Sequence, residues 1–297
     1  ISDIHIDIER IKNLQNSFDK LINDIILKGV SESILVIVGD IFENKTILTQ
    51  SEIGIFDNMM NLLNINSIKT IIVVGNHDFN INLESQSNKM VLDILTQSYN
   101  NITCLTYTQV YTVPDTNIEF HLYSIVDGKI PEYKENNNIK IALLHDSVNG
   151  AKYDNGVKIS GCKFNINDFK NYDYTLLGDI HKPQFLTTTI AYCGSFIQKN
   201  KGEGINHGYI LWDLKNKENT GFVFIPLIDV MIKIEVRDNK TLVLPELLEF
   251  QKVKYVQLLY DTKSTKVGLE KIKTEMIQKY GRIDKIIPVD KTFRNQL

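Results

Sequence analysis

The sequence contains little cysteine or proline and no long apolar run. Of its 297 residues, three are cysteine and six are proline. Cys104, Cys162 and Cys193 stand far apart and form no Cys-x-x-Cys pair, which argues against a thiolate zinc site and favours reduced thiols in a cytoplasmic compartment. No apolar stretch approaches the roughly 20 residues that a transmembrane helix needs, and no secretory signal is visible, so we expect no membrane partner.

The sequence also lacks a strong charge of one sign. Its 33 basic and 36 acidic residues give a net charge of −3, which by itself does not indicate a nucleic-acid-binding protein. Residues 226–297, however, hold fourteen Lys or Arg against ten Asp or Glu, whereas the rest of the chain holds nineteen against twenty-six. A basic region beside an acidic one suits a phosphate-backbone substrate, although ordinary scatter of surface charge explains the difference about equally well.

Five short polar clusters stand out along the chain, and four of them directly follow apolar runs. The clusters are residues 2–5, 39–44, 75–78, 144–146 and 178–181, and the runs are 34–38, 71–74, 141–144 and 175–177. Short apolar runs of this kind are typical of buried strands. In an α/β sheet, the carboxyl ends of the strands are where ligands bind, so the clusters are expected to meet at one edge.

The clusters supply carboxylate, imidazole and amide groups but no thiolate. Oxygen and imidazole ligands suit divalent ions such as Mn²⁺ or Mg²⁺. The alternative is a set of ordinary turns, since Asp, Asn and Gly favour turns in any protein. Five such clusters in chain order, most of them at the end of a strand, favour the metal site.

Asp-x-His, Gly-Asp, Gly-Asn-His-Asp, a single His after a strand and Gly-x-x-His together resemble the calcineurin-like metallophosphoesterase superfamily. Residues 178–184, 192–198, 202–203 and 207–212 resemble more narrowly its SbcD branch, the nuclease subunits of DNA-repair nuclease–ATPase complexes, which include phage and viral forms. The resemblance covers about residues 1–225. It implies phosphoester hydrolysis with two divalent ions, of which Mn²⁺ is expected first and Mg²⁺ second.

The resemblance assigns a ligand to each cluster. The first ion would be held by Asp3, His5 and His181, the second by Asn76 and His145, and Asp40 would bridge both. Asp179 stands where the superfamily usually has His. We expect Asp179 to bind the second ion directly; the alternative is that it accepts a hydrogen bond from a ligand.

Three further residues are candidates for catalysis. His77 is expected to face the substrate, stabilise charge and protonate the leaving oxygen. Asp78 is expected to orient His77 or its loop through a hydrogen bond. Glu43 stands where SbcD-type nucleases often carry a His that helps catalysis, which predicts a change in nuclease strength or in the strand end that is cut.

Alternating strands and helices followed by β-prone runs indicate a mixed α/β (α+β) fold, a two-sheet sandwich flanked by helices. Expected helices span residues 10–28, 50–64, 88–98 and 267–280, with a polar loop at 79–89, and runs at 189–193, 209–212 and 221–225 are expected to close the second sheet. His121 lies on the polar side of an alternating strand, which predicts a surface histidine. Pro226 marks the expected boundary between a phosphoesterase domain, 1–225, and a small α+β capping domain, 226–297.

The leading functional hypothesis is a metal-dependent DNA nuclease, an exonuclease or endonuclease of repair and recombination. Its expected partners are DNA, an SMC-like ATPase of the SbcC type and a second copy of the chain, in the cytoplasm, or the host cytoplasm for a phage or viral protein. Candidate DNA contacts are Lys182, Lys252, Lys254, Lys271, Lys273 and Lys279. Alternatives are a phosphomonoesterase or cyclic-nucleotide phosphodiesterase, and a non-catalytic metal-binding scaffold. The resemblance also predicts a strand before Ile1 and an ATPase-binding segment after Leu297.

Overall fold

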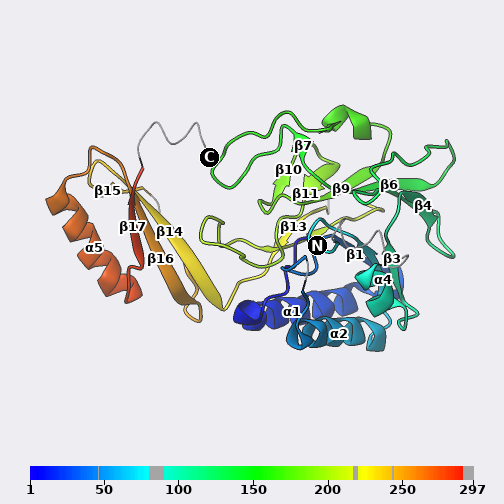
Figure 1. The fold of residues 1–297 in the computed structure, drawn as a ribbon, viewed down its shortest axis with the longest axis horizontal. Helices are drawn as coiled ribbons and strands as arrows, with labels where there is room; N and C mark the ends of the chain where they lie inside the picture. Colours follow the sequence, from blue (N-terminus) through cyan, green and yellow to red (C-terminus); the bar gives the residue numbers. More distant parts are fainter. Residues whose placement is uncertain (46, 80–89, 217–219, 243, 290–297) are drawn as a thin grey trace. The chain divides into compact units, whose positions relative to one another are not determined.

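The structure is a computed structural model that describes residues 1–45, 47–79, 90–216, 220–242 and 244–289. The chain divides into two compact units (Figure 1). The first unit consists of residues 1–197 and 208–225, and the second of residues 198–207 and 226–297. Among the described residues, no helix combines the length and the apolar character needed to span a bilayer.

Two sheets form the body of the first unit. The smaller sheet contains three parallel strands in the order β1 (Ile34–Val38), β2 (Lys69–Val73) and β3 (Ile102–Leu105). The larger sheet has the order β10 (Gln184–Phe185), β11 (Ile190–Tyr192), β9 (Tyr174–Gly178), β6 (Ile139–His145), β5 (Ile118–Tyr123) and β4 (Gln109–Thr112). Its four central strands are parallel and its two edge strands antiparallel.

The two sheets share one hydrophobic core. Val36, Val38 and Ile71 of the smaller sheet pack in the same cluster as Leu122 and Leu143 of the larger one. These strands are buried along most of their length, which explains why they read as continuous apolar runs in the sequence. The predicted mixed α/β fold with a two-sheet sandwich is confirmed.

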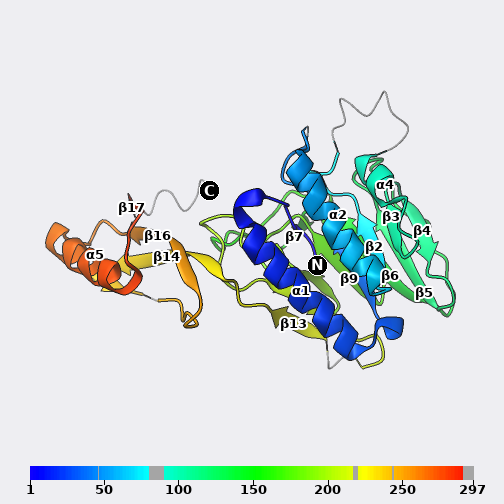
Figure 2. The ribbon, with the colours of Figure 1, turned by 90° about the horizontal axis from the view of Figure 1, so that it is seen from below.

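Two long helices, α1 (Ile11–Lys28) and α2 (Gln50–Ile65), lie side by side on one side of the sheets (Figures 1 and 2). Helix α1 buries an apolar stripe that includes Leu14, Phe18 and Leu21, and it ends at Gly29. A capping box between Thr49 and Glu52 begins α2. The third predicted helix is shorter than expected, α4 (Val91–Thr96), and the loop predicted at 79–89 lies outside the described residues after Phe79.

Short elements complete the first unit. They are the 3₁₀ turns η1 (Ile8–Arg10), η2 (Val30–Glu32) and η3 (Ile166–Phe169), the parallel pair β7 (Val148–Asn149) and β8 (Phe164–Asn165), and the antiparallel pair β12 (Gly208–Leu211) and β13 (Gly221–Phe224). The prediction that three late strands close the second sheet is therefore wrong. Only β11 joins that sheet, parallel to β9, while β12 and β13 pair with each other. Sequence periodicity identifies a strand, but its partner depends on the path of the chain.

The second unit is a four-stranded sheet with one helix. Its strands follow the order β15 (Lys240–Thr241), β14 (Asp229–Arg237), β16 (Lys252–Tyr260) and β17 (Lys285–Pro288), and α5 (Lys266–Tyr280) lies along the sheet (Figure 1). Every second residue of β14 is buried, as are Ile272 and Met276 of α5. The loop 198–207 joins this unit through Gln198, whose side-chain amide bonds both the backbone N–H and the carbonyl of Met231 at 2.8 Å.

The prediction that His121 is a surface histidine is wrong. Its side chain, on β5, is only 1% exposed, and its Nε2 lies 3.5 Å from a carboxylate oxygen of Glu119. The connection between β5 and β6 folds over this face: the Asn136 and Asn138 side chains donate to Glu119, and the Lys140 ammonium donates to Asn136. Polar side chains of the connection therefore cover the polar face of β5. For this reason, the alternation of polar and apolar residues along β5 does not predict which of them are exposed to solvent.

Buried His121 predicts a loss of stability in mild acid. Burial lowers the pKa of His121 below its ordinary value of 6.5, although Glu119 opposes the effect. Below that ordinary value the unfolded chain binds a proton that the folded chain does not, so the free energy of unfolding falls as the pH falls. In EDTA, we expect the urea midpoint to drop between about pH 7.5 and about pH 5.5, and His121→Asn to make that drop smaller. An equal drop in both proteins would contradict this account.

Candidate metal centre

The five polar clusters meet at one place in the first unit. Four of them follow the carboxyl ends of β1, β2, β6 and β9. The fifth, at the start of the chain, runs beside the loop after β1: the backbone N–H of Asp3 donates to the Gly39 carbonyl, and that of His5 donates to the Asp40 carbonyl, both at 3.0 Å. The carboxyl ends of strands from both sheets thus bring the candidate side chains together.

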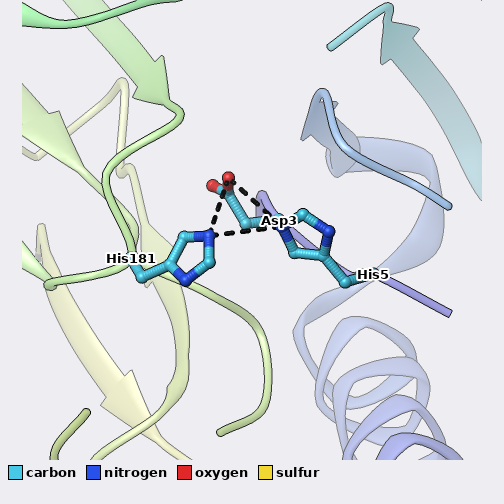
Figure 3. Close-up of side chains that lie close together, drawn as sticks. All are labelled: Asp3, His5 and His181. Carbon is cyan, nitrogen blue, oxygen red and sulfur yellow. Dashed lines mark hydrogen bonds and ion pairs between the residues drawn. The ribbon is translucent and has the colours of Figure 1, made fainter. Parts of the chain in front are cut away.

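Asp3, His5 and His181 form a first group of potential metal ligands (Figure 3). The Nε2 atoms of the two histidines lie 3.2 Å apart, and that of His181 lies 3.7 Å from a carboxylate oxygen of Asp3. Asp3 and His5 are buried, and His181 is partly exposed. One ligand atom from each residue therefore points into a common space, which is the arrangement that the sequence predicts for the first ion.

A second group is formed by Asp3, Asp40 and His145, all of them buried. The Nε2 atom of His145 lies 3.2 Å from Oδ1 of Asp40 and 3.1 Å from the amide oxygen of Asn76. Asn76 and His145, which the sequence assigns to the second ion, therefore lie together. The other carboxylate oxygen of Asp40 lies 3.5 Å from Nε2 of His5. Asp40 thus faces both groups, as a bridging carboxylate must.

The electrostatics of these groups fit a cation. Burial alone would lower the pKa of His145, but Asp40, and more weakly Asp3, outweigh it and raise that pKa to about 10. Burial likewise tends to raise the pKa of Asp40, yet His145 and His5 hold it well below its ordinary range. Buried carboxylates that stay charged require positive charge beside them, and carboxylate, imidazole and amide donors without thiolate suit Mn²⁺ or Mg²⁺.

Three histidines are oriented through their Nδ1 atoms. Nδ1 of His145 donates to the Val38 carbonyl at 2.7 Å, and Nδ1 of His77 donates to the Glu43 carbonyl, also at 2.7 Å. Nδ1 of His5 lies 3.2 Å from the carboxylate of Glu43. Because each Nδ1 has a partner, each Nε2 is left to face the site. Metal-binding histidines are commonly oriented in this way, by a hydrogen bond from the ring nitrogen that does not bind the metal. Glu43 therefore orients two histidines, one through its side chain and one through its backbone.

Asp78 supports the loops of the site and does not bond the His77 ring. Its carboxylate accepts the backbone N–H groups of Ile41 and Phe42 through Oδ1 and of Gly75 through Oδ2, at 2.8 to 3.1 Å. Burial, with the charge of Asp40 as a second cause, raises the pKa of Asp78 to about 7. Asp78 thus ties the loop after β1 to the loop after β2.

Several residues of the site adopt a backbone conformation that side chains rarely occupy. Asp3, His5, Asp40 and Asp179 have φ between 46° and 88°. Such conformations cost on the order of 1–3 kcal/mol each and persist where the surroundings enforce them, commonly at functional sites. Gly178 is needed for a different reason: a Cβ atom there would lie 2.2 Å from the Val38 carbonyl oxygen and 2.5 Å from Nδ1 of His145.

Comparison with known proteins identifies the family. The calcineurin-like phosphoesterase family model matches residues 1–183, more than half of the chain and all of the clusters described above. The chain belongs to the calcineurin-like phosphoesterases. It is also 33% identical, in an alignment of 249 residues that covers 74% of this chain, to the uncharacterized protein R555 of Acanthamoeba polyphaga mimivirus. That alignment spans 17% of the length of the viral protein.

Membership in the family supports metal-dependent phosphoester hydrolysis, because calcineurin-like phosphoesterases bind divalent metal ions. In this phosphoesterase the third group of potential ligands is His5, Asp40 and His77. His77 therefore borders the metal centre, with its backbone N–H donating to Asp40 at 2.8 Å. That position is compatible with a role toward the substrate, and a substitution distinguishes that role from metal binding, as discussed below.

Asp179 lies beside the two groups but is a member of none of the three ligand groups found among the described residues. Its backbone N–H donates to the Asp3 carboxylate at 3.2 Å, and its own carboxylate accepts a hydrogen bond from the Ser147 hydroxyl at 2.8 Å. Burial raises the pKa of Asp179. Direct ligation of an ion by Asp179 stays a prediction. The sequence did not suggest the hydrogen bond from Ser147, which occupies one oxygen of the same carboxylate.

Substitution of Asp179 separates these two roles. If Asp179 binds the second ion, Asp179→Ala should lose that ion selectively, and Asp179→His should keep two ions while raising relative tolerance for Zn²⁺ or Ni²⁺, because imidazole suits those ions better than a carboxylate does. Calorimetric titration with each metal measures both effects, and Ser147→Ala is the control. If Asp179→Ala still binds two ions with unchanged affinity, Asp179 is not a ligand.

The six candidate DNA contacts fall on different elements. Lys182 follows His181 in the first unit, Lys252 and Lys254 lie on β16, and the other three lie on α5, at positions 271, 273 and 279. Five of the six lysines therefore belong to the second unit. Two of them already have acidic neighbours: Lys254 lies 3.7 Å from Asp229, and Lys273 lies 3.4 Å from Glu270.

Proposed function

We propose that this phosphoesterase is a DNA nuclease that cleaves phosphodiester bonds with two divalent ions, Mn²⁺ in preference to Mg²⁺. The main support for two ions is the position of the Asp40 carboxylate, which has one oxygen near His5 and the other near His145. The choice of DNA rests on the SbcD-like motifs at 178–184 and 192–198 and on the basic second unit. The same motifs support an SMC-like ATPase of the SbcC type as partner and a role in repair or recombination.

The residues of the site have distinct tasks in this reaction. When bound, two divalent ions supply an activated water and neutralise charge on the phosphate. Asp3, His5 and His181 hold one position, Asn76 and His145 the other, and Asp40 lies between them. The Nδ1–H group of His77 donates a hydrogen bond to the Glu43 carbonyl. The other ring nitrogen, Nε2, is therefore the one that can bring a proton to the leaving oxygen. Asp78 keeps the two loops together.

One assay tests the proposal against its alternatives. End-labelled single- and double-stranded DNA is incubated with Mn²⁺ or EDTA, beside a phosphate monoester and a cyclic nucleotide, with His77→Ala as the control for contaminating nucleases. We expect Mn²⁺-dependent cleavage of DNA that the variant largely loses. Turnover of the monoester or cyclic nucleotide without DNA cleavage would favour the alternative hydrolases. Stoichiometric Mn²⁺ binding without any hydrolysis would favour a non-catalytic scaffold.

The mimivirus relative motivates one further part of the proposal, that the protein acts in a host cytoplasm if it is viral. The SbcD-like motifs motivate another, that it assembles as a homodimer with its ATPase partner. Sedimentation of the protein alone and with a candidate ATPase tests both assemblies. A strictly monomeric protein that binds no ATPase would overturn this part and leave the hydrolytic proposal standing.

The basic second unit is expected to hold DNA by its phosphates. The double variant Lys254→Gln, Lys271→Gln should weaken binding to the same degree for every DNA sequence. It should also reduce the salt slope, which is the slope of the logarithm of the binding constant against the logarithm of the salt concentration. The expected reduction is about 0.9 for each phosphate of duplex DNA that the variant no longer neutralises. The matched control is Lys129→Gln with Lys134→Gln, two lysines of the first unit that are 74% and 73% exposed. Fluorescence anisotropy at several salt concentrations gives both quantities. Equal slopes in the two double variants would mean that the positive charge of the second unit is only surface scatter.

A further inference from the structure

Residues 151–159, between β7 and β8, form a small hairpin that we call the Tyr153 hairpin. Its backbone is closed by bonds between Ile159 and Ala151, and between Tyr153 and Val157, at 2.7 and 3.0 Å. Ala151 and Ile159 at its base are buried in the hydrophobic core of the first unit. The base is therefore fixed, while the tip projects from the core.

Two connections hold this hairpin beside the metal centre. The chain reaches it from β6, which ends at the candidate ligand His145, through the short strand β7. The side-chain amide of Gln184 then clamps it: its oxygen accepts the Lys152 N–H at 2.8 Å, and its nitrogen donates to the carbonyls of Lys152 and Lys182 at 2.7 and 3.2 Å. Because Lys182 follows His181, one amide fixes the hairpin against the loop that carries a candidate metal ligand.

The exposed side chains of the hairpin are those of Lys152, Tyr153, Asn155 and Lys158. Tyr153 is 47% exposed, and none of the ring contacts among the described residues involves it. Lys152 and Lys158 are exposed, and within the described part of the chain neither they nor Lys182 pair with a carboxylate. Asp154 is only partly exposed. The hairpin therefore presents an open aromatic ring and two exposed lysines, and Gln184 ties it to the loop that carries Lys182.

We propose that the Tyr153 hairpin, together with Lys182, binds single-stranded DNA next to the metal centre, with Tyr153 stacking on a base and the lysines contacting phosphates. The proposal rests on the DNA nuclease function proposed above and names the surface that delivers the strand. An exposed ring can stack only on a base whose face is free, as in a single strand or a frayed end. An aromatic side chain combined with basic side chains that follow the backbone is the usual construction for such binding without sequence preference.

Tyr153 is tested against a matched tyrosine. Tyr107, between β3 and β4, is 48% exposed and serves as the control. With a fluorescent oligothymidine in EDTA, we expect Tyr153→Ala to weaken binding by about 5- to 150-fold, Tyr153→Phe to retain most of it, and Tyr107→Ala to bind like the parent. The thermal midpoint and the Mn²⁺ stoichiometry of each variant verify that fold and metal centre are intact.

The lysines give an independent measurement. Lys152→Gln and Lys158→Gln should each lower the salt slope by roughly 0.7, the value for one phosphate on a single strand, whereas Lys129→Gln should leave it unchanged. If the parent binds and cleaves DNA but the Tyr153 and lysine variants match their controls, the hairpin proposal is overturned and the nuclease proposal stands. If the parent neither binds nor cleaves DNA, both are overturned.

Discussion

Asp40→Asn is expected to lose most of its affinity for both ions. The two carboxylate oxygens of Asp40 face different histidines: one lies 3.5 Å from Nε2 of His5, and the other lies 3.2 Å from Nε2 of His145. Its replacement removes a negative charge from a buried site and one oxygen ligand from each ion. The loss in affinity should exceed the roughly 10- to 100-fold that follows from removing an outer partner of a ligand. Calorimetric titration with Mn²⁺ gives stoichiometry and affinity.

The matched control for this variant is Asp115→Asn. Asp115 is an exposed turn residue whose φ of 63° is close to the 52° of Asp40, so both substitutions place Asn in the same backbone conformation. Asn tolerates that conformation well, and neither variant should unfold the chain. If Asp40→Asn binds two ions as tightly as Asp115→Asn does, Asp40 is not a bridging ligand.

His77→Ala is expected to lower turnover by about 10²- to 10⁴-fold while two ions remain bound, because a general acid acts only on the transition state. The backbone N–H of residue 77, which donates to Asp40 at 2.8 Å, is kept in the alanine variant. The substitution therefore removes the ring and little else. Steady-state kinetics on DNA, with Mn²⁺ stoichiometry measured on the same sample, gives the result.

Asn76→Ala provides the contrast one residue earlier in the same loop. The Asn76 amide oxygen lies 3.1 Å from Nε2 of His145, so its removal should weaken binding of the second ion, and activity should fall for that reason. The two neighbouring variants thus separate a substrate-facing role from a ligand role. Loss of an ion in His77→Ala would make His77 a ligand, in agreement with its place in the group with His5 and Asp40.

The sequence predicted those parts of the fold that a local pattern determines. Strand β1 is buried on both faces, so it reads as an unbroken apolar run, and its bounds agree with the prediction of residues 34–38. Helix α1 buries one stripe, so it reads as an amphipathic repeat that ends at Gly29. Candidate ligands could be named for the same reason, because most of them follow apolar strands, and the carboxyl ends of these strands in the two sheets lie together.

Interactions between distant segments could not be read from such patterns. His121 is buried because a connection some fifteen residues later covers it, and polar residues at its position are equally common on a surface. Glu43 orients both His5 and His77, and these three residues lie on three separate segments: the start of the chain, the loop after β1 and the loop after β2. Gln198 bonds the backbone of Met231, 33 residues away, and so carries its loop into the second unit.

The central claim is that this site holds two divalent ions with Asp40 between them. A crystal grown with Mn²⁺ and measured at a wavelength where manganese scatters anomalously tests it most directly. We expect two anomalous peaks about 3.5–4 Å apart, one among Asp3, His5 and His181 and the other beside Asn76 and His145, each within about 2.5 Å of an Asp40 oxygen. A single peak, or two peaks with Asp40 bound to neither, would contradict the account.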